Sequence, residues 1–215
     1  MIKDIVNTAE VIIFDCDGVL MDSNPIKENA FYQVALGYFG RDGAEFIQDF
    51  HRKNGGLSRQ VKFSELMRHY RASRSVDLET LCIEFETELK DSLLKCKLAA
   101  GLESVLESLL KKGKKLLVLS GTPEPALKSI LDSRKLAHYF VEILGSPTLK
   151  PTHLLRLHKE AMLDFSKTFV FVGDSLTDKH AADEFSNCQF YWSTEFAKCD
   201  DINVKSISSL QELVP

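Results

Sequence analysis

The sequence has no long hydrophobic run, no closely paired cysteines and no excess of positive charge. Its first apolar run, residues 11–14, ends at Asp15 and is too short for a signal-peptide core or a membrane span. The five cysteines are an odd number with no Cys-x-x-Cys spacing, which predicts reduced thiols in a cytoplasmic protein. With 27 Lys and Arg against 31 Asp and Glu, we expect neither a nucleic acid nor a membrane as partner.

What is present is enough apolar material for a folded core. The 215 residues are 44% hydrophobic, and the formal net charge is only −4. This length fits one ordinary domain, or a medium domain that carries a smaller one. The composition is compatible with a monomer or a homodimer and does not indicate a function.

Short apolar runs rich in β-branched and aromatic residues predict strands at residues 11–14, 116–119, 139–144, 169–172 and 189–192. Amphipathic helical patterns separate the later runs, and Thr122-Pro123 has the composition of a helix start. Strands that alternate with helices are typical of an α/β fold with a doubly wound parallel sheet. We therefore predict this fold class for the chain.

The stretch from about residue 22 to residue 95 breaks the alternation. Apolar residues recur there at helical spacing, and no strand-like run interrupts them. The sequence therefore predicts two parts, a sheet core formed by residues 1–21 and 96–215 and a helical insert formed by residues 22–95.

Polar residues follow four of the predicted strands in order, namely Asp15-Cys16-Asp17-Gly18, Ser120, Lys150 and Gly173-Asp174-Ser175-Leu176-Thr177-Asp178. Taken singly, each has an ordinary interpretation as a turn, a helix cap or a surface lysine. Ligands bind at the carboxyl ends of strands in open α/β sheets, so the ordered set predicts one active site. Ser120, Gly121 and Thr122 are expected to hold an anion there, because Pro123 and Pro125 lack the N–H donor.

These four motifs resemble those of the haloacid dehalogenase-like hydrolase superfamily, and in particular its phosphoglycolate phosphatase and β-phosphoglucomutase-like members. The resemblance implies a Rossmann-like core, a helical cap at the place of the insert, and Mg²⁺-dependent phosphatase chemistry on a small anionic phosphorylated metabolite. The second aspartate of the first motif, Asp17, favours phosphoryl transfer over dehalogenation, because the dehalogenases lack it.

The resemblance also implies a role for each site residue. Asp15 would form an aspartyl-phosphate, and Asp17 would act as acid and base. The Mg²⁺ ligands would be the carboxylates of Asp15 and Asp174 and the backbone carbonyl of Asp17. Asp178 would join this shell or orient a water, Lys150 would add a fixed positive charge, and Ser120 would donate a hydrogen bond to a phosphoryl oxygen.

The basic stretch from His51 to Arg59 contains the pair Gly55-Gly56 and is either a solvated loop or a substrate-specificity loop. Its Gly-Leu-Ser-Arg is similar to a stretch of β-phosphoglucomutase-like proteins, which implies that Arg59, with Lys53, binds an anionic group of the substrate.

Three hypotheses about function remain open. Lys27 stands where the mutases carry a histidine, so we favour a phosphatase over a sugar-phosphate mutase. A phosphorylated sugar acid or carboxylated ester would suit the basic loop. The alternative from another class is a non-catalytic binding or regulatory protein that retains the fold.

Overall fold

The computed structural model describes residues 2–161, 164, 166–199 and 203–214. Its centre is a six-stranded parallel sheet in the order β3-β2-β1-β4-β5-β6. The strands are β1 (Val11–Phe14), β2 (Lys115–Pro123), β3 (Glu142–Ser146), β4 (Phe169–Gly173), β5 (Cys188–Ser193) and β6 (Ser206–Ile207). The central strands β1 and β4 are buried on both faces, which explains why each is a continuous apolar run.

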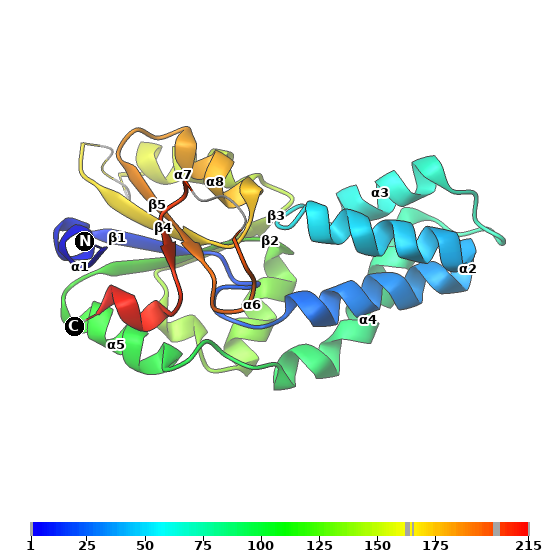
Figure 1. The fold of residues 1–215 in the computed structure, drawn as a ribbon, viewed down its shortest axis with the longest axis horizontal. Coiled ribbons are helices and arrows are strands. Elements are labelled where there is room, and N and C mark those ends of the chain that lie inside the picture. The colour runs from blue at the N-terminus through cyan, green and yellow to red at the C-terminus, as the bar shows by residue number, and fades with distance from the viewer. Residues whose placement is uncertain (1, 162–163, 165, 200–202, 215) are drawn as a thin grey trace.

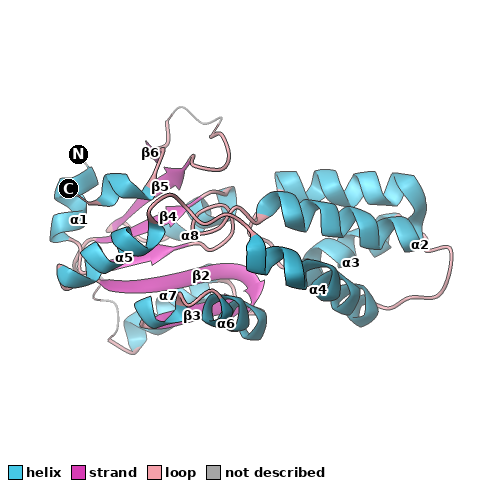
Figure 2. Ribbon diagram, turned by 90° about the horizontal axis from the view of Figure 1, so that it is seen from below, coloured by secondary structure: helices cyan, strands magenta, loops and turns pink. Residues whose placement is uncertain are grey.

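Helices cover both faces of the sheet (Figures 1 and 2). One face packs against α1 (Ile2–Thr8), α5 (Leu102–Lys111), α6 (Glu124–Ser133), and the short helices η1 (Ala137–Tyr139) and η2 (Leu210–Leu213). The other packs against α7 (Lys150–Lys159) and α8 (Leu176–Asp183). Along β1, Ile12 and Phe14 enter the first core and Val11 and Ile13 enter the second. This alternation of side chains gives the predicted doubly wound α/β fold, which is confirmed.

The helices α2 (Asn24–Lys53), α3 (Arg59–His69) and α4 (Leu78–Lys95) form a second body, which we call the helical unit. They share an apolar core of their own, in which Phe31, Phe63 and Phe85 contact one another. The backbone of α2 departs from helical angles at Gly40, so the helix is two segments joined at a bend. In Figure 1 the helical unit projects from one end of the sheet, and both chain termini lie at the opposite end.

Several element boundaries differ from the sequence predictions. β2 continues to Pro123, and α6 begins at Glu124, so Thr122 is not the helix cap and Pro125 is the proline of the first turn. The register between β2 and β3 shifts between Leu119 and Pro123, an irregularity that the run of residues 116–119 did not indicate. β3 begins only at Glu142, because residues 137–139 form the turn η1. Among the described residues, no helix has the length and apolar character that crossing a membrane requires.

Candidate active site

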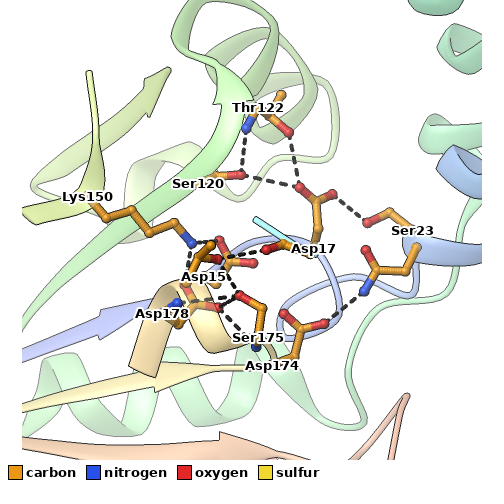
Figure 3. Close-up of polar contacts among 12 residues, drawn as sticks. Asp15, Asp17, Ser23, Ser120, Thr122, Lys150, Asp174, Ser175 and Asp178 are labelled. Carbon is orange, nitrogen blue, oxygen red and sulfur yellow. Dashed lines mark hydrogen bonds and ion pairs between the residues drawn. The ribbon is translucent and has the colours of Figure 1, made fainter. Parts of the chain in front are cut away.

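Three carboxylates and one lysine meet at the carboxyl ends of β1 and β4 (Figure 3). Asp15 directly follows β1 and Asp174 directly follows β4, whereas Asp178 lies in the first turn of α8. One ligand oxygen of each lies within 4.8 Å of those of the other two. Lys150, the first residue of α7, donates from Nζ to Asp15 Oδ1 at 2.7 Å and also to Asp178 Oδ1. Segments far apart in sequence therefore supply one buried charged cluster.

This cluster carries more negative charge than Lys150 neutralises. Burial raises the pKa of Asp15 well above its usual range, against the charge of Lys150, and the negative charge of Asp178 adds to the rise. Burial and the charges of Asp15 and Asp178 raise the pKa of Asp174 in the same way. Burial alone would lower the pKa of Lys150, but Asp15 and Asp178 reverse this and raise it. Clustered oxygen donors with surplus negative charge fit a hard divalent cation such as Mg²⁺.

The start of α8 holds Asp178 in place. Ser175 caps the helix and its hydroxyl donates to Asp178 Oδ2 at 2.5 Å, while the Ser175 N–H donates to the same oxygen at 3.2 Å. Since Oδ1 accepts from Lys150, both oxygens of Asp178 have protein donors. Asp178 therefore fixes Lys150 and the helix start, in addition to lying within reach of a shared cation.

Asp17 lies apart from the three clustered carboxylates and faces the helical unit. Its Oδ1 accepts from Ser23 Oγ at 2.5 Å, and its Oδ2 pairs with Lys27 Nζ at 2.5 Å and accepts from Thr122 Oγ1 at 3.0 Å. Burial alone would raise the pKa of Asp17, but Lys27 and the hydroxyl donors outweigh it and hold that pKa far below its usual range. Asp17 is therefore ionised and firmly oriented.

Ser120, Gly121 and Thr122 lie beside Asp17, at the irregular end of β2. Ser120 Oγ donates to Asp17 Oδ2 at 3.2 Å and accepts from the Thr122 N–H at 3.1 Å. The Thr122 N–H is thus engaged by Ser120, and anion binding by this N–H stays a prediction. Gly121 and Thr122 line the cavity described below, and Thr122 Oγ1 accepts a hydrogen bond from Lys27 Nζ at 2.7 Å.

The Gly55-Gly56 loop of the helical unit touches two loops of the sheet core. Gly56 has φ +81°, and a Cβ there would lie 2.0 Å from Thr177 Oγ1. A Cβ on Gly121 would lie 2.1 Å from the Gly56 carbonyl oxygen. Thr177 Oγ1 donates to the Gly55 carbonyl at 2.7 Å. Only glycine fits this close approach, so the pair brings the basic stretch against the site.

A cavity of about 650 Å³ lies between the helical unit and the carboxylates. Arg59 lines it, but its Nη1 pairs with Glu86 Oε2 at 3.1 Å and donates to the Cys82 carbonyl at 3.4 Å. Lys53 does not line it. Its Nζ pairs with Asp49 at 2.7 Å on an exposed stretch of α2, because the helical spacing of four residues places the two side chains together. The structure therefore places Lys53 outside the cavity, and its contact with substrate stays a prediction.

Sequence reasoning missed several residues that the structure brings to the site. Lys27 was noted only for the histidine it replaces, yet it binds Asp17 directly. Asn24 donates from Nδ2 to Asp174 Oδ2 at 2.8 Å, and His51 and Lys62 line the cavity together. The clustering of Asn24 and Lys27 directly after the first motif was the available signal. Lys62 gave none, because it lies within an ordinary amphipathic helical pattern.

A family model for haloacid dehalogenase-like hydrolases matches residues 12–192. The chain belongs to this family. The matched region runs from β1 to β5 and therefore contains all four motifs of the cluster. The resemblance predicted from the sequence is confirmed.

Two curated relatives with phosphatase names are similar to this chain in sequence. A phosphoglycolate phosphatase of Pseudomonas fluorescens is 30% identical over 181 residues, which make up 80% of this chain and 65% of the relative. A phosphorylated carbohydrates phosphatase of Thermotoga maritima is 30% identical over 132 residues, or 61% of this chain and 58% of the relative. The chain thus spans less than two thirds of the length of either relative.

Solved structures show the same fold. A predicted phosphoglycolate phosphatase from Haemophilus somnus superposes with a TM-score of 0.75 at 20% identity, covering 95% of this chain and 96% of that one. CbbY from Rhodobacter sphaeroides, solved in complex with phosphate, gives a TM-score of 0.74 at 18% identity with the same coverage of both chains. At these identities the likeness concerns the fold of haloacid dehalogenase-like hydrolases and not the substrate.

Proposed function

We propose that the protein is a Mg²⁺-dependent phosphatase that hydrolyses a small phosphorylated metabolite through an aspartyl-phosphate on Asp15. The observation that carries the proposal is the place of Asp15. It lies at the end of β1, 2.7 Å from Lys150 and within the carboxylate cluster, with Asp17 two residues further on. The phosphatase names of the two relatives support the same reaction class.

In the first step, an Asp15 carboxylate oxygen bonds to phosphorus while the bond from phosphorus to the ester oxygen breaks. The leaving oxygen takes a proton from Asp17. Asp17, which is ionised without substrate, takes up this proton from solvent when substrate binds, because the negative phosphoryl group beside it raises its pKa. Lys150 fixes the orientation of Asp15 throughout.

In the second step, Asp17 takes a proton from a water molecule, whose oxygen bonds to phosphorus while the Asp15–phosphorus bond breaks. Inorganic phosphate leaves and Asp15 is restored. Lys27 and the Thr122 hydroxyl orient the Asp17 carboxylate for this role. Ser120 lies 3.2 Å from Asp17, where its hydroxyl can turn to a phosphoryl oxygen.

A divalent cation belongs to the same proposal. The carboxylates of Asp15 and Asp174 and the backbone carbonyl of Asp17 would hold it, with Asp178 at the edge of the shell. When bound, Mg²⁺ neutralises charge on the transferring phosphoryl group. The raised pKa values of Asp15 and Asp174 support the fit, because burial and the neighbouring carboxylates both disfavour their negative charge, which a cation would stabilise.

The proposal also assigns a role to each of the two parts of the chain. Residues 1–21 and 96–215 would be the catalytic core and residues 22–95 the cap that selects the substrate. The separate apolar core of the helical unit and its contacts with Gly121 and Thr177 support this division. A cytoplasmic location is supported by Cys16, Cys82, Cys96 and Cys188, which form no disulfide.

The decisive experiment compares Asp15→Asn with wild type on p-nitrophenyl phosphate in the presence of MgCl₂. We expect kcat/KM to fall by about 10⁴-fold or more, because amide nitrogen and oxygen do not replace the nucleophilic carboxylate. Asp22→Asn is the matched control, since Asp22 does not line the cavity. Substantial turnover by Asp15→Asn would overturn the mechanism. Release of one phosphate per ester consumed separates a phosphatase from a mutase, which releases little.

A further inference from the structure

The charged residues of the cavity come from both sides. The sheet core contributes Asp15, Asp17 and Asp174, and the helical unit contributes the basic residues Lys27, His51, Arg59, Lys62 and Lys90. A basic wall opposite a phosphatase site is expected for an anionic substrate. Which of these cations is available to the substrate depends on what already neutralises it.

Two of the cations already have a carboxylate partner. Lys27 pairs with Asp17, and Arg59 pairs with Glu86. Lys90 lies on an exposed stretch of α4, where water solvates its charge. Within the described part of the chain, Lys62 differs from the other buried lysine and arginine side chains, Arg59 and Lys150, in having no carboxylate within ion-pair distance.

The side chains in contact with Lys62 are neutral, and the charges of Lys27, Asp17, Asp174 and Asp15 act on it only from further away. Lys62 is 2% exposed, its Nζ donates to His51 Nδ1 at 2.8 Å, and the Phe31 ring lies with its centroid 5.5 Å from Nζ. A backbone hydrogen bond with Asn24 orients the same imidazole. Burial lowers the pKa of Lys62 to about 7 and that of His51 to about 3, so the ring is a neutral acceptor. A buried ammonium that faces a cavity without a counter-ion is costly until an anion joins it.

We propose that Lys62 binds a carboxylate on the substrate, separate from the phosphoryl group, and that the substrates are phosphorylated carboxylic acids. The inference rests on the proposed phosphatase function and names its substrate class. One uncompensated cation matches the single charge of a carboxylate better than the double charge of a second phosphate. The cavity of about 650 Å³ is in the size range of pockets that enclose drug-sized ligands, so there is room for a body longer than two carbons.

The test uses pairs of esters that differ only in a carboxylate or a hydroxymethyl group. The pairs are 2-phosphoglycolate with 2-hydroxyethyl phosphate, 3-phosphoglycerate with glycerol 3-phosphate, and 6-phosphogluconate with sorbitol 6-phosphate. For each pair the ratio of kcat/KM for the acid to kcat/KM for the alcohol is measured with wild type, Lys62→Met and Lys62→Gln. Each ratio comes from one preparation, so a loss of folded enzyme affects both members equally.

We expect wild type to prefer the acid at least about tenfold in at least one pair, and both variants to lose that preference, mainly through KM of the acid. Lys53→Met removes the same charge outside the cavity and keeps the wild-type ratio. No acid preference in any pair, or a preference that survives in both Lys62 variants, would overturn the inference. So would its loss in Lys90→Met alone. Absence of phosphate release from every ester would instead overturn the proposed function.

Discussion

Two lysines are buried on opposite sides of the cavity, and their surroundings differ sharply. Lys150, on the side of the sheet core, is 7% exposed and pairs with Asp15 and Asp178. Lys62, on the side of the helical unit, is 2% exposed and has His51 and Phe31 as neighbours. The pKa of Lys150 is raised by its partners, whereas burial lowers the pKa of Lys62 to about 7. Lys150 therefore has carboxylate partners within ion-pair distance, whereas Lys62 has none.

This difference separates the chemistry from the recognition. The residues around Lys150 follow strand ends or open a helix, and they hold each other through direct hydrogen bonds. Such preorganised groups suit a reaction that is shared by many phosphate esters. The helical unit presents an uncompensated cation that only a ligand satisfies, which suits selection among those esters.

The largest expected effect comes from replacing Lys150, the buried lysine that has carboxylate partners. In Lys150→Met, Asp15 and Asp178 lose their counter-ion while they stay buried. We expect the free energy of unfolding to fall by about 3–5 kcal/mol and kcat/KM on p-nitrophenyl phosphate to fall by about 10²–10³-fold. Urea unfolding and steady-state kinetics measure the two effects. A variant as stable as wild type would show that the cluster does not depend on Lys150.

The same substitution at Lys62 is expected to raise the free energy of unfolding instead of lowering it. The pKa of Lys62 in the folded state, about 7, lies below the ordinary value of 10.5, so above pH 7 the unfolded chain binds more protons. The stability of wild type therefore rises with pH between those values, by up to about 1.4 kcal/mol per unit, and is lowest below pH 7.

Lys62→Met lacks this titration. We expect it to be more stable than wild type below pH 7, by a few kcal/mol, with the difference shrinking as pH rises toward 10. Parallel urea unfolding of both proteins across this range measures the difference. A constant difference at all pH values would contradict a buried, uncompensated ammonium, and Lys53→Met controls for the loss of an exposed lysine charge.

A smaller effect concerns the surplus charge of the carboxylate cluster. The folded-state pKa of Asp174 is raised above its unfolded value, so its ionisation destabilises the metal-free fold as pH rises between the two. In EDTA at pH 8, Asp174→Asn should be more stable than wild type by about 1 kcal/mol, or about 2–4 °C in Tm. Excess MgCl₂ should raise the Tm of wild type more than that of the variant. Equal responses to MgCl₂ would show that Asp174 does not hold the cation.

The strands of the sheet core and the polar residues that follow them could largely be predicted from the sequence. The runs at residues 11–14 and 169–172 coincide with β1 and β4 to within one residue, and the polar residues after them converge because parallel strands end at one edge. The helix α1 was missed, because residues 1–10 are mixed and polar. β6 was missed, because it is only two residues long.

In the helical unit, the sequence did not predict which basic side chains have a carboxylate partner. The motif around Arg59 indicated an anion-binding residue, but its counter-ion, Glu86, lies 27 residues away on another helix. Lys62 stands among polar residues of an amphipathic pattern, and its burial depends on how α3 packs against His51 and Phe31. Which cation is neutralised is a property of helix packing, and no local pattern records it.

The smallest expected effect is that of Glu86→Gln. Arg59 has a carboxylate partner and Lys62 has none, and this substitution would reduce that difference. Glu86→Gln takes the counter-ion from Arg59 and leaves a second unmatched cation in the cavity. Because Glu86 is 62% exposed, the ion pair is worth only about 0.5–1 kcal/mol, so we expect the acid-to-alcohol ratio to rise by about two- to fivefold. The double variant Lys62→Met/Glu86→Gln should recover part of the preference that Lys62→Met loses. A ratio that falls in Glu86→Gln would mean that Arg59 needs its partner to keep α3 and α4 in register, and that charge matching in the helical unit is structural at Arg59.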